Sequence, residues 1–197
     1  EASKSLAGAS KYCHQTWQYP SPLEDPSGFV SSLIDAVGRL GITAIMPVTD
    51  STTQVLAARR DEFPAAILNA VPPLESYELV SDKYRLMKVA QELGVPIPAT
   101  VYVHDGDLAS VLNQVTSFPV VVKPGRSLLM TDRGWGKTSV HFVSSVEALV
   151  DLYRSVPYLK NPSLIQQRVE GEGQGVFGLF DHGRPCALFA HRRIREK

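Results

Sequence analysis

The chain has 197 residues, 44% of them hydrophobic, which is long enough to form a packed core in one or two domains. Its 20 Lys and Arg residues equal its 20 Asp and Glu residues, so no overall charge favours nucleic acid or an anionic membrane. No apolar run approaches the roughly 20 residues that cross a bilayer, and the start of the chain has no signal-peptide pattern. We therefore expect a cytoplasmic protein with neither a nucleic-acid nor a membrane partner.

The first part of the chain alternates helical and strand patterns. Asp25 is a helix cap, and the apolar residues that follow it recur at helical spacing as far as Leu40. The apolar runs 42–48 and 65–71 are short enough for buried strands, and a capped helix lies between them. This order predicts an α/β fold that begins with a partial Rossmann-like parallel sheet over residues 1–80, without its first strand.

The pattern changes after residue 80. The expected elements are a helix over 82–93, a strand over 99–103, a helix over 106–115, a strand that ends at Lys123, a strand over 138–143, a helix over 146–155, a strand over 163–169, and a hairpin that pairs 176–180 with 186–191. The chain starts without Met and stops without a terminating signal, so we expect a fragment of a longer protein.

Two lysines occupy positions that the packing of a core does not explain. Lys123 follows the apolar run Val120–Val122, so its ammonium group would project from a nonpolar strand beneath a glycine-rich loop. Lys83 begins the earlier helix, directly after its cap Asp82. Two such lysines can bind one polyphosphate. The alternative for Lys123 alone is an ordinary strand-end lysine whose charged group reaches water.

The loop after Lys123 combines glycines with cations, as a phosphate-binding loop does. The residues concerned are Gly125, Arg126, Arg133, Gly134, Gly136 and Lys137. An ordinary hairpin loop is the alternative. The sequence from Gly136 to Thr138 matches the end of a P-loop, but Thr131 occupies the position of that motif's first glycine, which excludes a Walker A motif.

The order of these motifs resembles the ATP-grasp superfamily, especially its carbamoyl-phosphate synthase and biotin carboxylase branch. The motifs are Asp82-Lys83, Gly94-Val-Pro-Ile-Pro98, Phe118-Pro-Val-Val-Val-Lys-Pro124, the glycine loop, and Leu164-Ile-Gln-Gln-Arg-Val-Glu-Gly171. The resemblance implies a pre-ATP-grasp domain over 1–80, an N-terminal ATP-grasp lobe with its glycine loop over 81–162, and the truncated start of a C-terminal lobe over 163–197.

The same resemblance implies roles for individual residues in binding ATP. Lys83 and Lys123 would contact phosphates, with Gly134 and Gly136 in the loop that closes over them. The backbone carbonyl of Gln167 and the backbone N–H of Val169 would pair with adenine, and Gln174 would contact the ribose. Many relatives have an acidic residue where this chain has Gln166 or Gln167, which weakens the side-chain part of the match. The alternative for these glutamines is the ordinary polarity of an edge strand.

The resemblance further implies a strand that faces phosphate and substrate. Alternation would direct His191, Arg193 and Arg195 to one face, although a solvated charged strand remains the alternative. The family's magnesium ligands, a Glu followed by Glu-x-Asn, have no match before Lys197. We therefore expect no metal ligand in this fragment, catalytic residues beyond its end, and no activity from the fragment alone.

By this resemblance the intact protein would be an ATP-dependent C–N ligase that uses Mg²⁺. ATP would phosphorylate a small carboxylate, or bicarbonate, and an amine would capture the resulting acyl phosphate. One alternative is a non-catalytic, regulatory nucleotide-binding module of the same fold. Another is a structural α/β domain in which both lysines are incidental.

Overall fold

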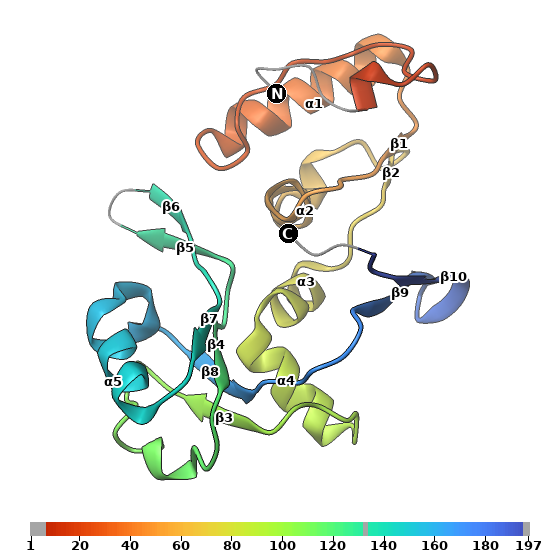
Figure 1. Cartoon of the computed structure of the whole chain (residues 1–197). Coiled ribbons are helices and arrows are strands. Elements are labelled where there is room, and N and C mark those ends of the chain that lie inside the picture. The colour runs from red at the N-terminus through yellow and green to blue at the C-terminus, as the bar shows by residue number, and fades with distance from the viewer. Residues whose placement is uncertain (1–6, 132–133, 195–197) are drawn as a thin grey trace.

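The computed structural model describes residues 7–131 and 134–194. Its α-helices are α1 (Pro26–Leu40), α2 (Asp50–Ala58), α3 (Leu74–Ser81), α4 (Lys83–Glu92) and α5 (Val146–Ser155). Its strands are β1 (Ala44–Ile45), β2 (Leu68–Asn69), β3 (Thr100–Val103), β4 (Val120–Pro124), β5 (Leu128–Thr131), β6 (Gly134–Lys137), β7 (His141–Val143), β8 (Ser163–Gln167), β9 (Gln174–Asp181) and β10 (Arg184–Arg192). In Figure 1, α1 lies at one end of the molecule and the sheet that contains β4 lies at the other.

The N-terminal part contains the predicted parallel pairing, in a reduced form. Strand β1 pairs with β2 in parallel, with Ala44 opposite Leu68. Phe29 of α1 and Leu56 of α2 are buried in the small core of this part. Both strands are shorter than the predicted apolar runs 42–48 and 65–71, and each is hydrogen-bonded to a single neighbour within the described residues.

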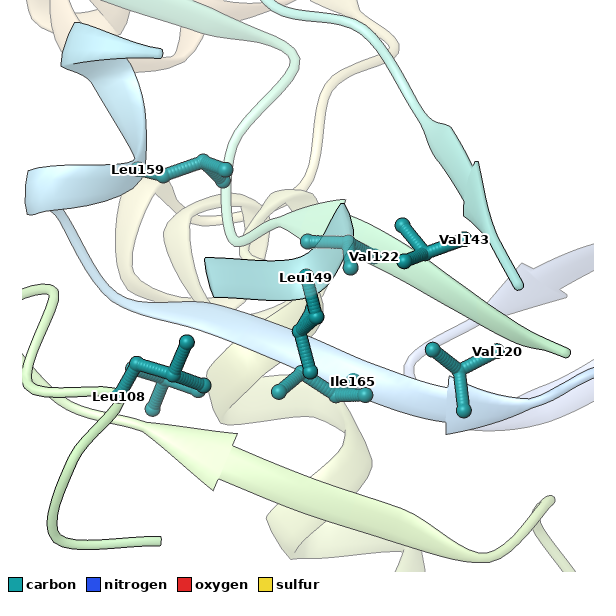
Figure 2. Packing of buried hydrophobic residues seen from close by; sticks show 8 residues of the cluster. Leu108, Val120, Val122, Val143, Leu149, Leu159 and Ile165 are labelled. Atoms are coloured by element: carbon teal, nitrogen blue, oxygen red, sulfur yellow. The ribbon is translucent and has the colours of Figure 1, made fainter. Parts of the chain in front are cut away.

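The larger sheet has the strand order β3-β8-β4-β7, and every neighbouring pair in it is antiparallel. Helix α5 covers one face, where Leu149 packs against Val122 of β4 and Ile165 of β8 (Figure 2). The helix predicted over 146–155 is thereby confirmed. Because side chains alternate along a strand, Val121 and Lys123 lie on the opposite face of β4.

The predicted helix over residues 106–115 was wrong. The chain turns at Asp105 (φ 49°) and Gly106 (φ 71°), and then forms only a short 3-10 helix at Leu112–Gln114. The Ser110 hydroxyl donates to the Asp107 carbonyl oxygen (3.0 Å) and Asp107 Oδ1 accepts from the Ser110 backbone N–H (3.2 Å), so side-chain contacts occupy backbone groups that a continuing helix would use.

Tyr153 of α5 gives the sheet a pH-dependent anchor, since its hydroxyl lies 2.8 Å from Ser163 Oγ on β8. Burial raises the pKa of Tyr153 from its ordinary value of 10.0 to about 12, because the charged phenolate is poorly solvated there. A raised pKa in the folded state means that this stabilising contribution is complete below pH 10.0 and is lost as the pH rises toward about 12.

We therefore expect Tyr153→Phe to lose less stability than the wild type between pH 8 and pH 11, as measured by urea unfolding at both values. Tyr12→Phe is the matched control, because Tyr12 is 83% exposed and should leave the wild-type pH response unchanged. An equal loss of stability in Tyr153→Phe and the wild type would contradict the assignment.

The predicted C-terminal hairpin is confirmed. Strands β9 and β10 pair antiparallel across a two-residue turn in which His182 (φ 47°) and Gly183 (φ 78°) both have positive φ, as a type I′ turn requires. Figure 1 shows this hairpin apart from the larger sheet, with α4 between them in that view. Within the described residues, no helix is both long and apolar enough to cross a membrane.

Candidate functional site

Lys83 is held at the start of α4, against the end of β4. Asp82 caps the helix by accepting hydrogen bonds from the backbone N–H groups of Tyr84 (2.9 Å) and Arg85 (3.3 Å). The backbone N–H of Lys83 donates to the carbonyl oxygen of Gly125, one residue beyond β4, at 2.7 Å. The position of Lys83 is therefore tied to the strand that carries Lys123.

Gly125 lies where three segments meet. Its own N–H donates to the carbonyl oxygen of Pro162 (2.9 Å), just before β8. A Cβ atom at this position would lie 3.0 Å from that same oxygen and 3.1 Å from Asp82 Oδ1. Glycine therefore allows the backbones of β4, α4 and the β8 approach to pack closely, a role that the sequence pattern did not indicate.

The two lysines influence each other electrostatically. The pKa of Lys83 is lowered mainly by partial burial, and the positive charge of Lys123 lowers it further. Asp82 and, more weakly, Asp50 act in the opposite direction. The structure thus brings the two ammonium groups into one electrostatic environment, in which an anion would relieve both the desolvation and the repulsion.

The predicted glycine loop is a β-hairpin in the structure. Strand β5 pairs with β6, with Leu129 opposite Gly136 and Thr131 opposite Gly134. Thr138 anchors the base of the hairpin, donating from Oγ1 to the Arg126 carbonyl oxygen (2.7 Å) and from its backbone N–H to the Ser127 carbonyl oxygen (3.0 Å).

Lys83 reaches this anchored base, where its Nζ donates to Ser127 Oγ at 2.9 Å. Both ends of the hairpin are thus fixed beside the lysine. Arg133, expected in the same loop, lies outside the described residues.

The sequence did not predict that residues of the N-terminal part lie beside the hairpin region. The Tyr77 hydroxyl of α3 donates to Asp50 Oδ1 of α2 at 2.6 Å, and burial together with Asp50 raises the pKa of Tyr77. A cavity of about 20 Å³, room for about one water molecule, lies between these residues and Arg126 and Trp135 of the hairpin region. The sequence around α2 indicated only a helix cap. A helix cap does not predict contacts with residues that are distant in the chain.

The predicted adenine-contacting residues lie at the end of β8. Gln167 is the last residue of the strand, and its backbone N–H donates to the Ala99 carbonyl oxygen (2.9 Å). Its side chain shares the α5 face with Ile165, whereas Gln166 shares the opposite face with Val121 and Lys123. Val169 follows the strand and is exposed.

The remaining predicted site residues lie on the separate hairpin β9–β10. Gln174 is paired with Arg192, and His191 with Gly175, so the side chains of Gln174 and His191 lie on opposite faces. The backbone N–H of Arg193 donates to the Gly173 carbonyl oxygen at 2.7 Å. Arg195 lies outside the described residues. The structure therefore groups Lys83, Lys123 and the β5–β6 hairpin, and places Gln174, His191 and Arg193 on another element.

Solved structures share the fold of much of this chain. D-alanine–D-alanine ligase from Bacillus anthracis aligns over 81% of this chain and 50% of its own, with a TM-score of 0.57 and 17% identity. An ADP complex of N5-carboxyaminoimidazole ribonucleotide synthetase aligns over 83% and 41%, with a TM-score of 0.57 and 10% identity. The biotin carboxylase domain of the Hydrogenobacter thermophilus 2-oxoglutarate carboxylase, in complex with MgADP, ADP and bicarbonate, aligns over 75% and 34%, with a TM-score of 0.53 and 20% identity.

These proteins are ATP-grasp ligases, and the chain has part of the ATP-grasp fold. It spans between 34% and 50% of the length of these three neighbours. At such low identity the similarity establishes the fold. No protein-family model matches the sequence, and no curated protein matches it.

Proposed function

We propose that this chain is the ATP-binding part of an ATP-dependent carboxylate–amine ligase. The observation that carries the proposal is the environment of Lys83, which is partly buried, lies within the electrostatic influence of Lys123 and is fixed at the base of a glycine-containing hairpin. A lysine is costly to keep charged in such a place unless an anion binds it. A polyphosphate satisfies both lysines at once.

Within this proposal each predicted residue keeps a defined role. Lys83 and Lys123 neutralise the phosphates, and Gly134 and Gly136 belong to the hairpin that covers them. The adenine contacts Gln167 and Val169 through their backbone, and Gln174 contacts the ribose. His191, Arg193 and Arg195 belong to the surface that faces the substrate. We also propose the division into parts at 1–80, 81–162 and 163–197.

The reaction that we propose couples ATP cleavage to bond formation between a small carboxylate, or bicarbonate, and an amine. The carboxylate oxygen attacks the γ-phosphorus to give an acyl phosphate and ADP, and the amine then displaces phosphate at the carbonyl carbon. A magnesium ion, when bound, would supply positive charge that lowers the charge to be stabilised. Within 7–131 and 134–194, no group of three or more His, Cys, Asp or Glu residues could hold a metal ion, so we assign no magnesium ligand.

Phosphate recognition by two lysines predicts that affinity rises with phosphate number. We expect ATP to bind more tightly than ADP, and ADP more tightly than AMP, with at least about a tenfold difference between ATP and AMP from the added charge-assisted contacts. Calorimetric titration of the chain with the three nucleotides and MgCl2 measures this order. Equal affinities, or no binding of ATP, would overturn the proposed function.

A further inference from the structure

A cavity of about 220 Å³ opens on the face of the larger sheet that carries α5. Val120 of β4 and Ile165 of β8 form its base, and both are buried members of the core cluster in Figure 2. Val120 and Lys123 are three residues apart on β4, so their side chains lie on opposite faces. The sheet therefore separates this cavity from the proposed phosphate site.

The cavity lies where a loop replaces the predicted helix over 106–115. The end of the short 3-10 helix Leu112–Gln114 and the loop that follows it form one wall. Val101 of β3, which is only partly buried, contributes to the other wall. Every described residue that lines the cavity lies between positions 99 and 167, so the N-terminal part and the β9–β10 hairpin do not contribute to it.

The rim of the cavity carries neutral polar side chains that have no hydrogen-bond partner. They belong to Gln114, Thr116, Ser117 and Gln167, which are all exposed, and no described residue donates to these side chains or accepts from them. Amide and hydroxyl groups can both donate and accept. Among the described residues that line the cavity, none is charged. An apolar base with a few polar groups around it is typical of a small-molecule site.

The volume and the absence of charge define the kind of ligand. A cavity of about 150 Å³ holds one benzene ring, so about 220 Å³ accommodates one ring with a small substituent. Pockets for drug-sized ligands measure about 300–1,000 Å³, so a nucleotide is too large for this cavity. An ion would lose its hydration here without meeting an opposite charge.

We propose that this cavity is a second small-molecule site, which binds an uncharged single-ring compound that carries an amide or a similar neutral polar group. The ring contacts the apolar base, and the polar group forms hydrogen bonds with Thr116 and Ser117 at the rim. The site does not depend on the proposed function. Gln167 connects the two, because its side chain lines the cavity and its backbone carbonyl is the proposed contact for adenine.

Benzamide is the probe for this site, because it combines one ring with a neutral amide. Titration of the wild-type chain, followed by protein NMR, should give a Kd of about 1 mM or tighter. Benzoate has nearly the same shape but carries a negative charge, so it should bind at least about tenfold more weakly. Absence of benzamide binding, or equal binding of benzamide and benzoate, would overturn the proposal.

Ala99→Phe tests the location of the site. Ala99 lines the cavity, is exposed and lies two residues before Val101, so a phenylalanine ring would occupy the space on the same face. Phenylalanine is favoured in strands, so we expect the fold to be retained, as measured by thermal unfolding. The affinity for benzamide should fall at least about tenfold. Unchanged affinity in Ala99→Phe would show that benzamide binds elsewhere, and the proposal would be wrong.

Two further variants make this test specific. Ala44→Phe places the same side chain at an exposed strand position that does not line the cavity, and it should leave benzamide affinity unchanged. Ser117→Ala removes one rim hydroxyl at an exposed position and should weaken benzamide binding several-fold. Equal weakening by Ala44→Phe and Ala99→Phe would contradict the assignment.

MgATP distinguishes this site from the proposed nucleotide site. Benzamide should remain bound at saturating MgATP, because the two sites lie on opposite faces of the sheet. Complete displacement of benzamide by MgATP would place it in the nucleotide site and would overturn this inference while the proposed function stands. A chain that binds benzamide in the manner described but does not bind ATP would have the opposite meaning.

Discussion

Lys123→Ala should weaken ATP binding roughly 10- to 150-fold, which is the range that corresponds to one lost charge-assisted hydrogen bond. Lys123 lies on the sheet face opposite α5, and its charge already lowers the pKa of Lys83. Removing it therefore deletes a phosphate contact and also relieves a repulsion within the free protein. We expect the loss of affinity without a loss of folding stability, measured by calorimetric titration and thermal unfolding of the same preparation.

Lys160→Ala is the matched control for this substitution. Lys160 is an exposed lysine at the end of the 3-10 helix Pro157–Lys160, and its loss should leave ATP affinity unchanged. An unaltered ATP titration for Lys123→Ala would count decisively against the phosphate site. Equal weakening by both substitutions would indicate a nonspecific charge effect and would also contradict it.

Gly125→Ala should lower both stability and nucleotide affinity. The added Cβ would lie 3.0 Å from the Pro162 carbonyl oxygen and 3.1 Å from Asp82 Oδ1, so either the approach to β8 or the start of α4 must move. Overpacking of this kind costs about 1–3 kcal/mol. Because the N–H of Lys83 is bonded to the Gly125 carbonyl oxygen, the shift would also displace Lys83 from the phosphate site.

Gly38→Ala separates this effect from the general consequence of replacing a glycine. Gly38 lies inside α1, and a Cβ there would have no atom within 4 Å. Alanine should therefore stabilise the helix by about 0.5–1 kcal/mol and leave ATP affinity unchanged. Urea unfolding and calorimetry of both variants measure the contrast, and a Gly125→Ala variant as stable as the wild type would refute the packing role.

Elements with strong local signals could be predicted from the sequence. Helices α1 and α5 begin at the residues that follow their capping side chains, Asp25 and Ser145, because a cap and an apolar stripe are properties of neighbouring residues. The predicted strand lengths were less accurate, because the length of a strand depends on how many of its residues form hydrogen bonds with a neighbouring strand. In the 106–115 segment, where a helix was predicted, side-chain hydrogen bonds of Asp107 and Ser110 to the backbone stabilise a turn.

The features of the candidate site also divide into those with a local sequence signal and those without one. Lys123 stood out because a lysine at the end of an apolar strand is a local anomaly. The hydrogen bonds from Tyr77 to Asp50 and from Gln166 to Thr100 join residues 27 and 66 positions apart, and neither has a local pattern. Such pairs become visible only when the fold brings their elements together.

The backbone at Gly125 is already fully occupied by the protein, with its N–H on Pro162 and its carbonyl oxygen accepting from Lys83. It acts as a joint of the scaffold, and the β5–β6 hairpin is attached next to it through separate contacts of Thr138. The sequence of the β5–β6 hairpin can therefore change while this joint keeps α4, β4 and the approach to β8 together.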